Sequence, residues 1–89
     1  MVKVGEYSFE IIDNYREAFN EEEFISLFTD YFYDYDYIIG DYEYSKLRLK
    51  GFYEDNNKKC KKYNKISNKD EYIKKYCAYN CKYFVLKKI

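Results

Sequence analysis

The chain has 89 residues, with 16 basic and 16 acidic side chains, three cysteines, and neither His nor Pro. This length allows one domain, residues 1–89, with a modest core. The odd cysteine count and the lack of an apolar leader argue against a secreted disulfide scaffold, and no apolar run could span a membrane. We expect a cytoplasmic protein without a membrane anchor, a disulfide staple or a disulfide-linked partner.

The composition predicts an aromatic core, because the chain contains 14 Tyr and 7 Phe but no Trp. Buried tyrosine rings stabilise a core, although each buried hydroxyl needs a hydrogen-bond partner. We therefore expect most rings inside and most hydroxyls at the surface. The excess of Tyr, Lys, Asn and Ile also fits AT-rich codons, so the tyrosine count alone does not indicate a binding face.

The charges are distributed unevenly along the chain. Residues 1–45 carry 12 acidic and 2 basic side chains, whereas residues 46–89 carry 4 acidic and 14 basic ones. This asymmetry can indicate a polyanionic partner. Alternatively, the two halves neutralise each other across one sheet, or two molecules meet head to tail.

The first elements predicted are a β-hairpin and a helix. Apolar residues alternate on both sides of Gly5, which is typical of a hairpin. Asn20 can cap a helix, Glu23 completes a capping-box pattern and Phe19 can pack on Phe24. The apolar spacing extends this helix to about residue 32 or 33. Its predicted core stripe consists of Phe24, Leu27, Phe28, Tyr31 and Tyr35.

Residues 35–53 are predicted to form two central strands. Ile38 and Ile39 end at Gly40-Asp41, which resembles a turn. Leu47 and Leu49 then alternate with cations, as expected for a strand with one buried face. Gly51 inside this strand indicates a bulge or a close approach to the backbone.

The last third of the chain is predicted to be loop, helix and strand. Residues 54–65, which we call the lysine loop, are rich in Asn and Lys and predict a solvated, mobile segment. Ser67 or Asn68 can cap a second helix, and Asn80 can end it. Its predicted buried stripe is Tyr72, Ile73, Tyr76 and Cys77. The strand that follows has apolar groups on both faces, so we expect it inside the sheet.

Three segments carry a family resemblance: Tyr37 to Tyr42, Leu47 to Phe52 (Leu-Arg-Leu-Lys-Gly-Phe), and Cys81 to Lys88. Together they resemble the YutD-like family over nearly the whole chain. The resemblance implies a small bacterial cytoplasmic domain of unknown function, and it brings no catalytic residue.

The order of elements predicts an α+β fold with one mostly antiparallel sheet of four to five strands. We expect two helices on one face of the sheet. Without its first short strand, the order matches the split β-α-β arrangement of ferredoxin-like folds.

The main functional hypothesis is contact with RNA or a ribonucleoprotein. The run from Lys50 to Phe52 falls where RNA-recognition motifs carry a Lys/Arg-Gly-Phe/Tyr sequence, but the match ends there. If Arg48, Lys50 and Phe52 share an open sheet face, Phe52 can stack on a base and the cations can pair with phosphates. The alternative is a cationic outer face that keeps the sheet soluble. The candidate binding residues are Arg48, Lys50, Phe52, Lys58, Lys59, Lys61 and Lys62.

A second hypothesis is a protein-protein adaptor that binds a basic partner through the acidic, tyrosine-rich region of residues 31–44. Charge reversals at Asp34 and Asp36 would separate it from RNA binding.

A third hypothesis, a degenerate metal-dependent nuclease, has weaker support. Asp41 and Lys50 have suitable spacing, but Arg48 stands where a second carboxylate is needed. Asp34, Asp36, Asp41 and Glu43 could gather a cation, although such clusters are commonly surface charge. Cys60, Cys77 and Cys81 are too few for a structural zinc site, and Cys77 is expected to be a small buried residue. We therefore expect no enzyme, metal or cofactor.

Overall fold

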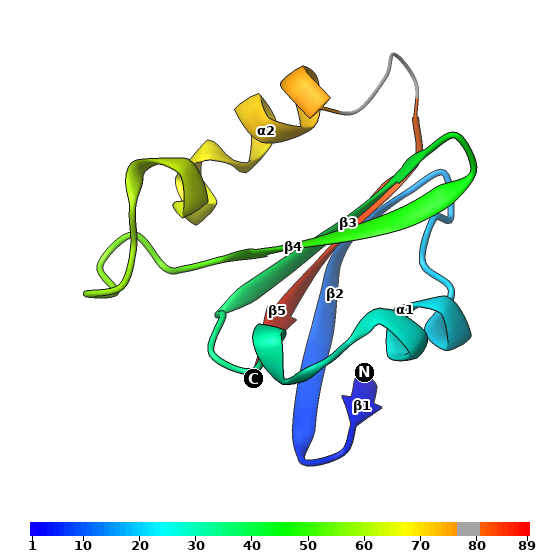
Figure 1. The fold of residues 1–89 in the computed structure, drawn as a ribbon, viewed down its shortest axis with the longest axis horizontal. Helices are drawn as coiled ribbons and strands as arrows, with labels where there is room; N and C mark the ends of the chain where they lie inside the picture. The colour runs from blue at the N-terminus through cyan, green and yellow to red at the C-terminus, as the bar shows by residue number, and fades with distance from the viewer. Residues whose placement is uncertain (77–80) are drawn as a thin grey trace.

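The computed structural model describes residues 1–76 and 81–89, which form a five-stranded antiparallel sheet with two α-helices (Figure 1). This confirms the α+β class. Neither described helix is long and apolar enough to cross a membrane. The elements are β1 (Val2–Val4), β2 (Tyr7–Tyr15), α1 (Glu21–Leu27), β3 (Tyr37–Glu43), β4 (Lys46–Phe52), α2 (Lys69–Tyr76) and β5 (Tyr83–Lys88), with short 3-10 turns η1 (Asp30–Phe32), η2 (Lys62–Asn64) and η3 (Ile66–Asn68).

The strand order is β1-β2-β5-β3-β4, and every neighbouring pair is antiparallel. Strands β2 and β3 both oppose β5, so they are parallel to each other, joined through α1 and separated by β5. In the same way β4 and β5 are joined through α2 and separated by β3. The chain therefore contains two interleaved split β-α-β units, and β5 lies inside the sheet as predicted.

The two helices lie on opposite faces of the sheet (Figure 1). Phe24 and Phe28 of α1 pack in a cluster with Phe9, Ile38 and Phe84. The second cluster contains Ile39, Phe52 and Val85, against which Tyr72 and Ile73 of α2 pack. The prediction of two helices on one face is therefore wrong. Its physical cause is the strand alternation: Phe84 and Val85 point to opposite faces, and each face needs its own apolar cover.

Helix α1 begins as predicted but ends early. The Asn20 side chain accepts a hydrogen bond from the Glu23 backbone N–H at 3.0 Å, and the Phe19 and Phe24 rings are 5.8 Å apart. Phe28 is already extended at ψ 112°, so the helix stops at Leu27. The predicted stripe is therefore wrong at Leu27, which is 40% exposed, and at Tyr31, which lies in η1 and is 67% exposed.

The central hairpin turns at Tyr44-Ser45 and not at Gly40-Asp41. Tyr44 and Ser45 have φ values of 51° and 65°, and a two-residue type I′ hairpin turn requires a positive φ at both positions. Gly40 lies inside β3, at a position where a side chain would overlap the Phe84 ring. Gly51 is paired with Ile38 without a bulge, and the Tyr35 ring lies where its side chain would be, so the close-approach alternative is confirmed.

The lysine loop is solvated as predicted, with most of its residues exposed, but several contacts hold it to the rest of the protein. The Asp36 carboxylate accepts hydrogen bonds from the Glu54 backbone N–H at 2.8 Å and from Asn57 Nδ2 at 3.0 Å. Asn64 is buried, and the backbone of Tyr53 bridges to Lys65. Backbone polar groups that leave a sheet edge need partners, and short-range turns supply them here.

Cys60 and Cys81 differ in their bonding. Cys60 has a free thiol. Cys81 is disulfide-bonded, which corrects the expectation of no disulfide. The predicted burial of Cys77 and the ending at Asn80 lie outside the described residues.

Candidate lysine and tyrosine groove

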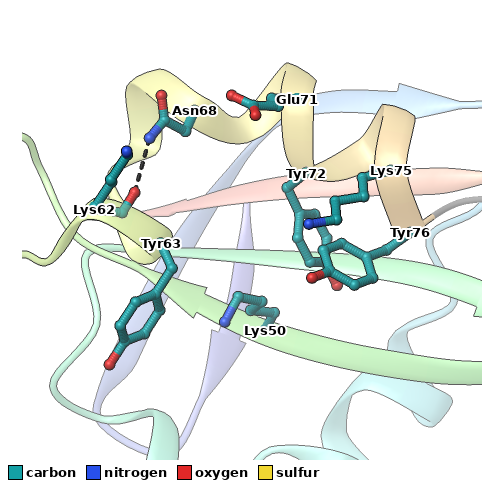
Figure 2. Close-up of a pocket in the computed structure, with 8 residues that line it drawn as sticks. All are labelled: Lys50, Lys62, Tyr63, Asn68, Glu71, Tyr72, Lys75 and Tyr76. Atoms are coloured by element: carbon teal, nitrogen blue, oxygen red, sulfur yellow. Dashed lines mark hydrogen bonds between the residues drawn. The ribbon is translucent and has the colours of Figure 1, made fainter.

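A groove of about 740 Å³ runs between strand β4, turn η2 and helix α2 (Figure 2). We call it the lysine–tyrosine groove. Three of its lining side chains are cations and three are tyrosines. The lining residues are Lys50, Lys62, Tyr63, Asn68, Glu71, Tyr72, Lys75 and Tyr76.

Helix periodicity places one wall of the groove. Tyr72 and Tyr76 are four residues apart on α2, so they lie on the same side of the helix, and their ring centroids are 5.1 Å apart. The Tyr72 ring also packs edge-on against Phe52 at 5.4 Å. Tyr72 therefore anchors the helix to the sheet, whereas Tyr76 is 50% exposed.

The other wall comes from β4 and the lysine loop. Lys50 projects from β4, and its Nζ lies 5.5 Å from the Tyr63 ring centroid and 5.7 Å from that of Phe52. Tyr63 is 66% exposed, so its ring can accept a further contact. The hydrogen bond from Asn68 Nδ2 to the Lys62 backbone oxygen, 2.8 Å long, fixes the end of the groove (Figure 2).

The groove has an excess of positive charge. Among the described residues, no ion pair engages Lys50, Lys62 or Lys75, and Glu71 is the single carboxylate of the lining. Lys75 Nζ lies 5.4 Å from the Tyr76 ring centroid. Cations beside exposed aromatic rings suit an anionic ligand with apolar or planar parts.

Burial raises the pKa of the Tyr72 hydroxyl to about 12, and the negative charge of Asp41 adds to this shift. The hydroxyl therefore stays neutral at physiological pH and does not add negative charge to the groove.

Arg48, two residues before Lys50 on β4, is already neutralised. Its Nη2 is 2.6 Å from Asp41 Oδ2, and its Nη1 is 2.8 Å from Glu43 Oε2. Nη2 also donates to the backbone oxygen of Tyr76 at 3.0 Å, which ties the C-terminal end of α2 to β4. The hydrogen bond to Asp41 raises the pKa of the guanidinium. Arg48 is thus a structural cation that holds α2 in place.

The structure separates the residues proposed for RNA contact. Lys50 and Lys62 line the groove, but Phe52 is fully buried beneath α2, so the expectation of an open Phe52 ring is wrong. Lys59 pairs with Asp34 at 2.7 Å. Lys58 and Lys61 are exposed and lie outside the groove lining.

Sequence reasoning missed four of the side chains that shape the groove. The apolar spacing predicts a buried Tyr76, and no motif indicates a binding role for Tyr63, Lys75 or Asn68. The available signal was the pair of Lys and Tyr residues repeated in Lys62-Tyr63 and Lys75-Tyr76.

The carboxylates considered for a metal site are used elsewhere. Asp34 pairs with Lys59, Asp36 holds the lysine loop and Asp41 is buried against Arg48. Within residues 1–76 and 81–89, no group of three His, Cys, Asp or Glu side chains is placed to hold a metal ion.

Comparison with known proteins places the chain among small bacterial proteins of this fold. Residues 3–87 match the family described as "Putative antitoxin YutD-like", so the chain belongs to the YutD-like family. It is 47% identical over 89 residues to "Putative antitoxin YutD" of Bacillus subtilis (strain 168), covering all of this chain and 98% of that protein. The solution NMR structure of protein yutD from B. subtilis superposes with a TM-score of 0.83 at 47% identity, over 100% of this chain and 81% of that one.

Proposed function

We propose that this chain is a non-catalytic binding protein of the cytoplasm that acts as an antitoxin by holding an acidic protein partner in the lysine–tyrosine groove. The family description and the name of the B. subtilis relative supply the antitoxin role. The observation that carries the proposal is the groove itself, in which three lysines without ion pairs among the described residues surround exposed tyrosine rings.

The chemistry of the groove suits a protein interface. Tyr63 and Tyr76 offer large rings at low entropic cost, and tyrosine is enriched among the residues that dominate interface energies. Lys50, Lys62 and Lys75 supply charge complementarity, which sets the on-rate and selects acidic partners. The tyrosine-rich acidic region is less suited to a basic partner, because Asp34 and Asp36 already have partners within the protein.

RNA is the second candidate, favoured by the exposed Lys58 and Lys61 next to Lys62 at the mouth of the groove. A cationic groove with aromatic rings is the usual platform for single-stranded nucleic acid. In this candidate Tyr63 and Tyr76 replace Phe52 as the stacking rings.

The test is capture of partners from host extract, with each sample divided and one part treated with ribonuclease. Three baits are compared: the natural protein, Lys62→Glu/Lys75→Glu, and the matched control Lys3→Glu/Lys74→Glu. Both variants change the net charge equally, and all four lysines are exposed or line the groove. The captured protein is then purified and titrated against each bait by calorimetry.

We expect one acidic protein that survives ribonuclease, binds the control variant normally and binds the groove variant at least about tenfold more weakly. Loss of all captured protein after ribonuclease would replace this proposal by the RNA candidate. Equal binding by the two variants would show that the groove is not the site that binds the partner.

A further inference from the structure

Strand β4 has an open outer edge. It lies last in the strand order, paired with β3 on one side. On its outer side, within the part of the chain that the structure describes, a single bridge forms beyond the strand's end, between Tyr53 and Lys65. An unpaired edge is a template for another strand.

The bridge fixes the direction of the backbone groups along this edge. The Tyr53 N–H donates to the Asn64 oxygen at 2.8 Å, and the Ile66 N–H donates to the Tyr53 oxygen at 2.9 Å. The N–H and C=O of Tyr53 therefore point outward. Successive residues of a strand point their backbone groups to alternate sides, so those of Gly51, Leu49 and Leu47 also point outward.

The backbone carbonyl of Phe52 points the other way, toward β3, as this alternation requires. Its carbonyl oxygen accepts a hydrogen bond at 3.0 Å from the backbone N–H of Asp36, which leads into β3. Phe52 and the other even-numbered residues of β4 thus face the existing sheet. Leu47, Leu49 and Gly51 form a row of backbone donors and acceptors without partners among residues 1–76 and 81–89, and this row continues the Tyr53–Lys65 pairing.

A hollow of about 320 Å³ lies along this row. It is lined by four consecutive residues of β4, 48–51, and consecutive residues alternate between the two faces of a sheet. The hollow therefore follows the edge of the strand and does not lie on one face. Tyr31 and Tyr35 form one side, and Tyr63, Asn64 and Tyr72 form the other.

The charges on β4 decide which strand can pair with this edge. Arg48 and Lys50 project to the α2 side, where Lys62 and Lys75 lie nearby. A second copy of β4 would place these cations opposite like charges, which is unfavourable. A strand with carboxylates on the α2 side and apolar groups toward Leu49, Tyr31 and Tyr35 would complement both sides of the hollow.

We infer that the outer edge of β4 is a strand-addition site for an extended partner segment in which acidic and apolar residues alternate. This inference rests on the proposed function and names the form of the partner segment, which pairs with the β4 edge beside the lysine–tyrosine groove. The peptide backbone pairs with Leu47, Leu49 and Gly51, its acidic side chains contact Lys50, and the Tyr63 ring covers its end.

The probe is a capped eight-residue peptide in which Glu alternates with Ile and Val, titrated into the full chain labelled for NMR. We expect the amides of Leu47, Leu49 and Gly51 to gain hydrogen-exchange protection, because they acquire acceptors. The amides of Arg48 and Lys50 already belong to the β3–β4 ladder and should change little. Lys50→Glu should weaken binding by about tenfold, and the exposed control Lys3→Glu should not.

A second peptide, with Lys in place of Glu, provides a control that leaves the protein unchanged and should not bind. The inference is overturned if the acidic peptide gives no protection along β4, whether it fails to bind or contacts Lys62 and Lys75 alone. It is also overturned if sedimentation shows a dimer and the amides of Leu47, Leu49 and Gly51 are already protected from exchange without peptide. In each case the capture experiment still decides the proposed function, because its variants lie on η2 and α2 and not on β4.

Discussion

Two glycines of the central hairpin stand where aromatic rings from distant parts of the chain come closest to the backbone. At Gly40 a Cβ atom would overlap the ring of Phe84, which is fully buried. At Gly51 it would overlap the ring of Tyr35. The missing side chains leave room for these rings next to the strands.

We predict that Gly40→Ala destabilises the protein by about 2 kcal/mol, because the Phe84 ring is enclosed and must move. Urea unfolding would measure the change. The exposed substitution Lys46→Ala in the same hairpin should cost less than about 0.5 kcal/mol. The double variant Gly40→Ala/Phe84→Leu should lose less unfolding free energy than the two single variants lose together, since the smaller side chain relieves the overlap. If the two changes in unfolding free energy were strictly additive, the Phe84 ring would not be the reason that glycine is needed at position 40.

These residues also show why part of the hairpin could not be predicted from the sequence. Gly40-Asp41 resembles a turn locally, but Gly40 is required by a ring 44 positions later in the chain. The real turn uses Tyr44 and Ser45, two residue types that seldom adopt a positive φ. The strands were found because their apolar alternation is local, whereas the turn depends on tertiary contacts.

Helices α1 and α2 differ in how firmly they are attached to the sheet. Helix α1 buries Phe24 completely within the aromatic cluster. Helix α2 has no fully buried residue, and it contacts the sheet through half-buried Tyr72 and Ile73 and the bond from Arg48. The local opening of α2 should therefore need less free energy than the opening of the central strands.

We predict that the amides in the second half of α2 exchange with solvent through openings about 2 kcal/mol or more below those of Val85 and Leu86 in β5. Native-state hydrogen exchange measures both. Arg48→Met should speed exchange in α2, because it removes the contact with Tyr76. It should also lower the protection of β5, because buried Asp41 loses its cation, but α2 should remain the less protected element. Equal protection in α2 and β5 would show that the helix is an integral part of the core.

The start of α1 was predictable and its end was not. Asn20, Glu23 and Phe19 act within a few residues, so their pattern is visible in the sequence. The end at Leu27 depends on the chain crossing beneath the sheet to reach β3. The apolar spacing continues past this point because Phe32 packs against the same cluster from η1.

For the whole molecule, the uneven charges are explained by pairing across the sheet. Strand β3 belongs to the acidic half and β4 to the basic half, and their register places Asp41 opposite Arg48 and Glu43 opposite Lys46. Lys59 and Asp34 make a similar pair outside the sheet. The alternative of mutual neutralisation therefore holds for these pairs, while three other lysines of the basic half, Lys50, Lys62 and Lys75, line the groove.

The groove itself was only partly predictable. The Lys-Gly-Phe run indicates Lys50, and the run of lysines in the lysine loop indicates Lys62. Tyr63 and Tyr76 gained a role through the folding of η2 and α2 over β4, which brings together segments that are separate in sequence. The sequence also did not indicate which face each helix would cover.

Stability in alkaline solution should depend on the buried tyrosines. Burial, reinforced by the hydrogen bond to Glu54, raises the pKa of Tyr37 to about 12, and burial raises that of Tyr72 to about 12. A tyrosine in the unfolded chain ionises near pH 10, so the folded state keeps these two hydroxyls neutral to a higher pH than the unfolded state does. Their contribution is complete below about pH 10 and is lost as the pH rises to about 12.

We predict that Tyr37→Phe/Tyr72→Phe loses less stability than the natural protein between about pH 10 and pH 12. Urea unfolding followed by circular dichroism across this range measures the difference. Tyr44→Phe is the control, since Tyr44 is 93% exposed and should behave as the natural protein does. Parallel curves for all three proteins would contradict the assignment.

The position of β5 has a consequence for biosynthesis. This strand follows all the others in the chain, yet it lies between β2 and β3. Until the ribosome has delivered residues 83–88, β2 and β3 each present an unpaired edge, and the two aromatic clusters lack Phe84 and Val85. The sheet must therefore close after β5 has emerged, and nascent chains that stall before it would present open edges to chaperones and proteases.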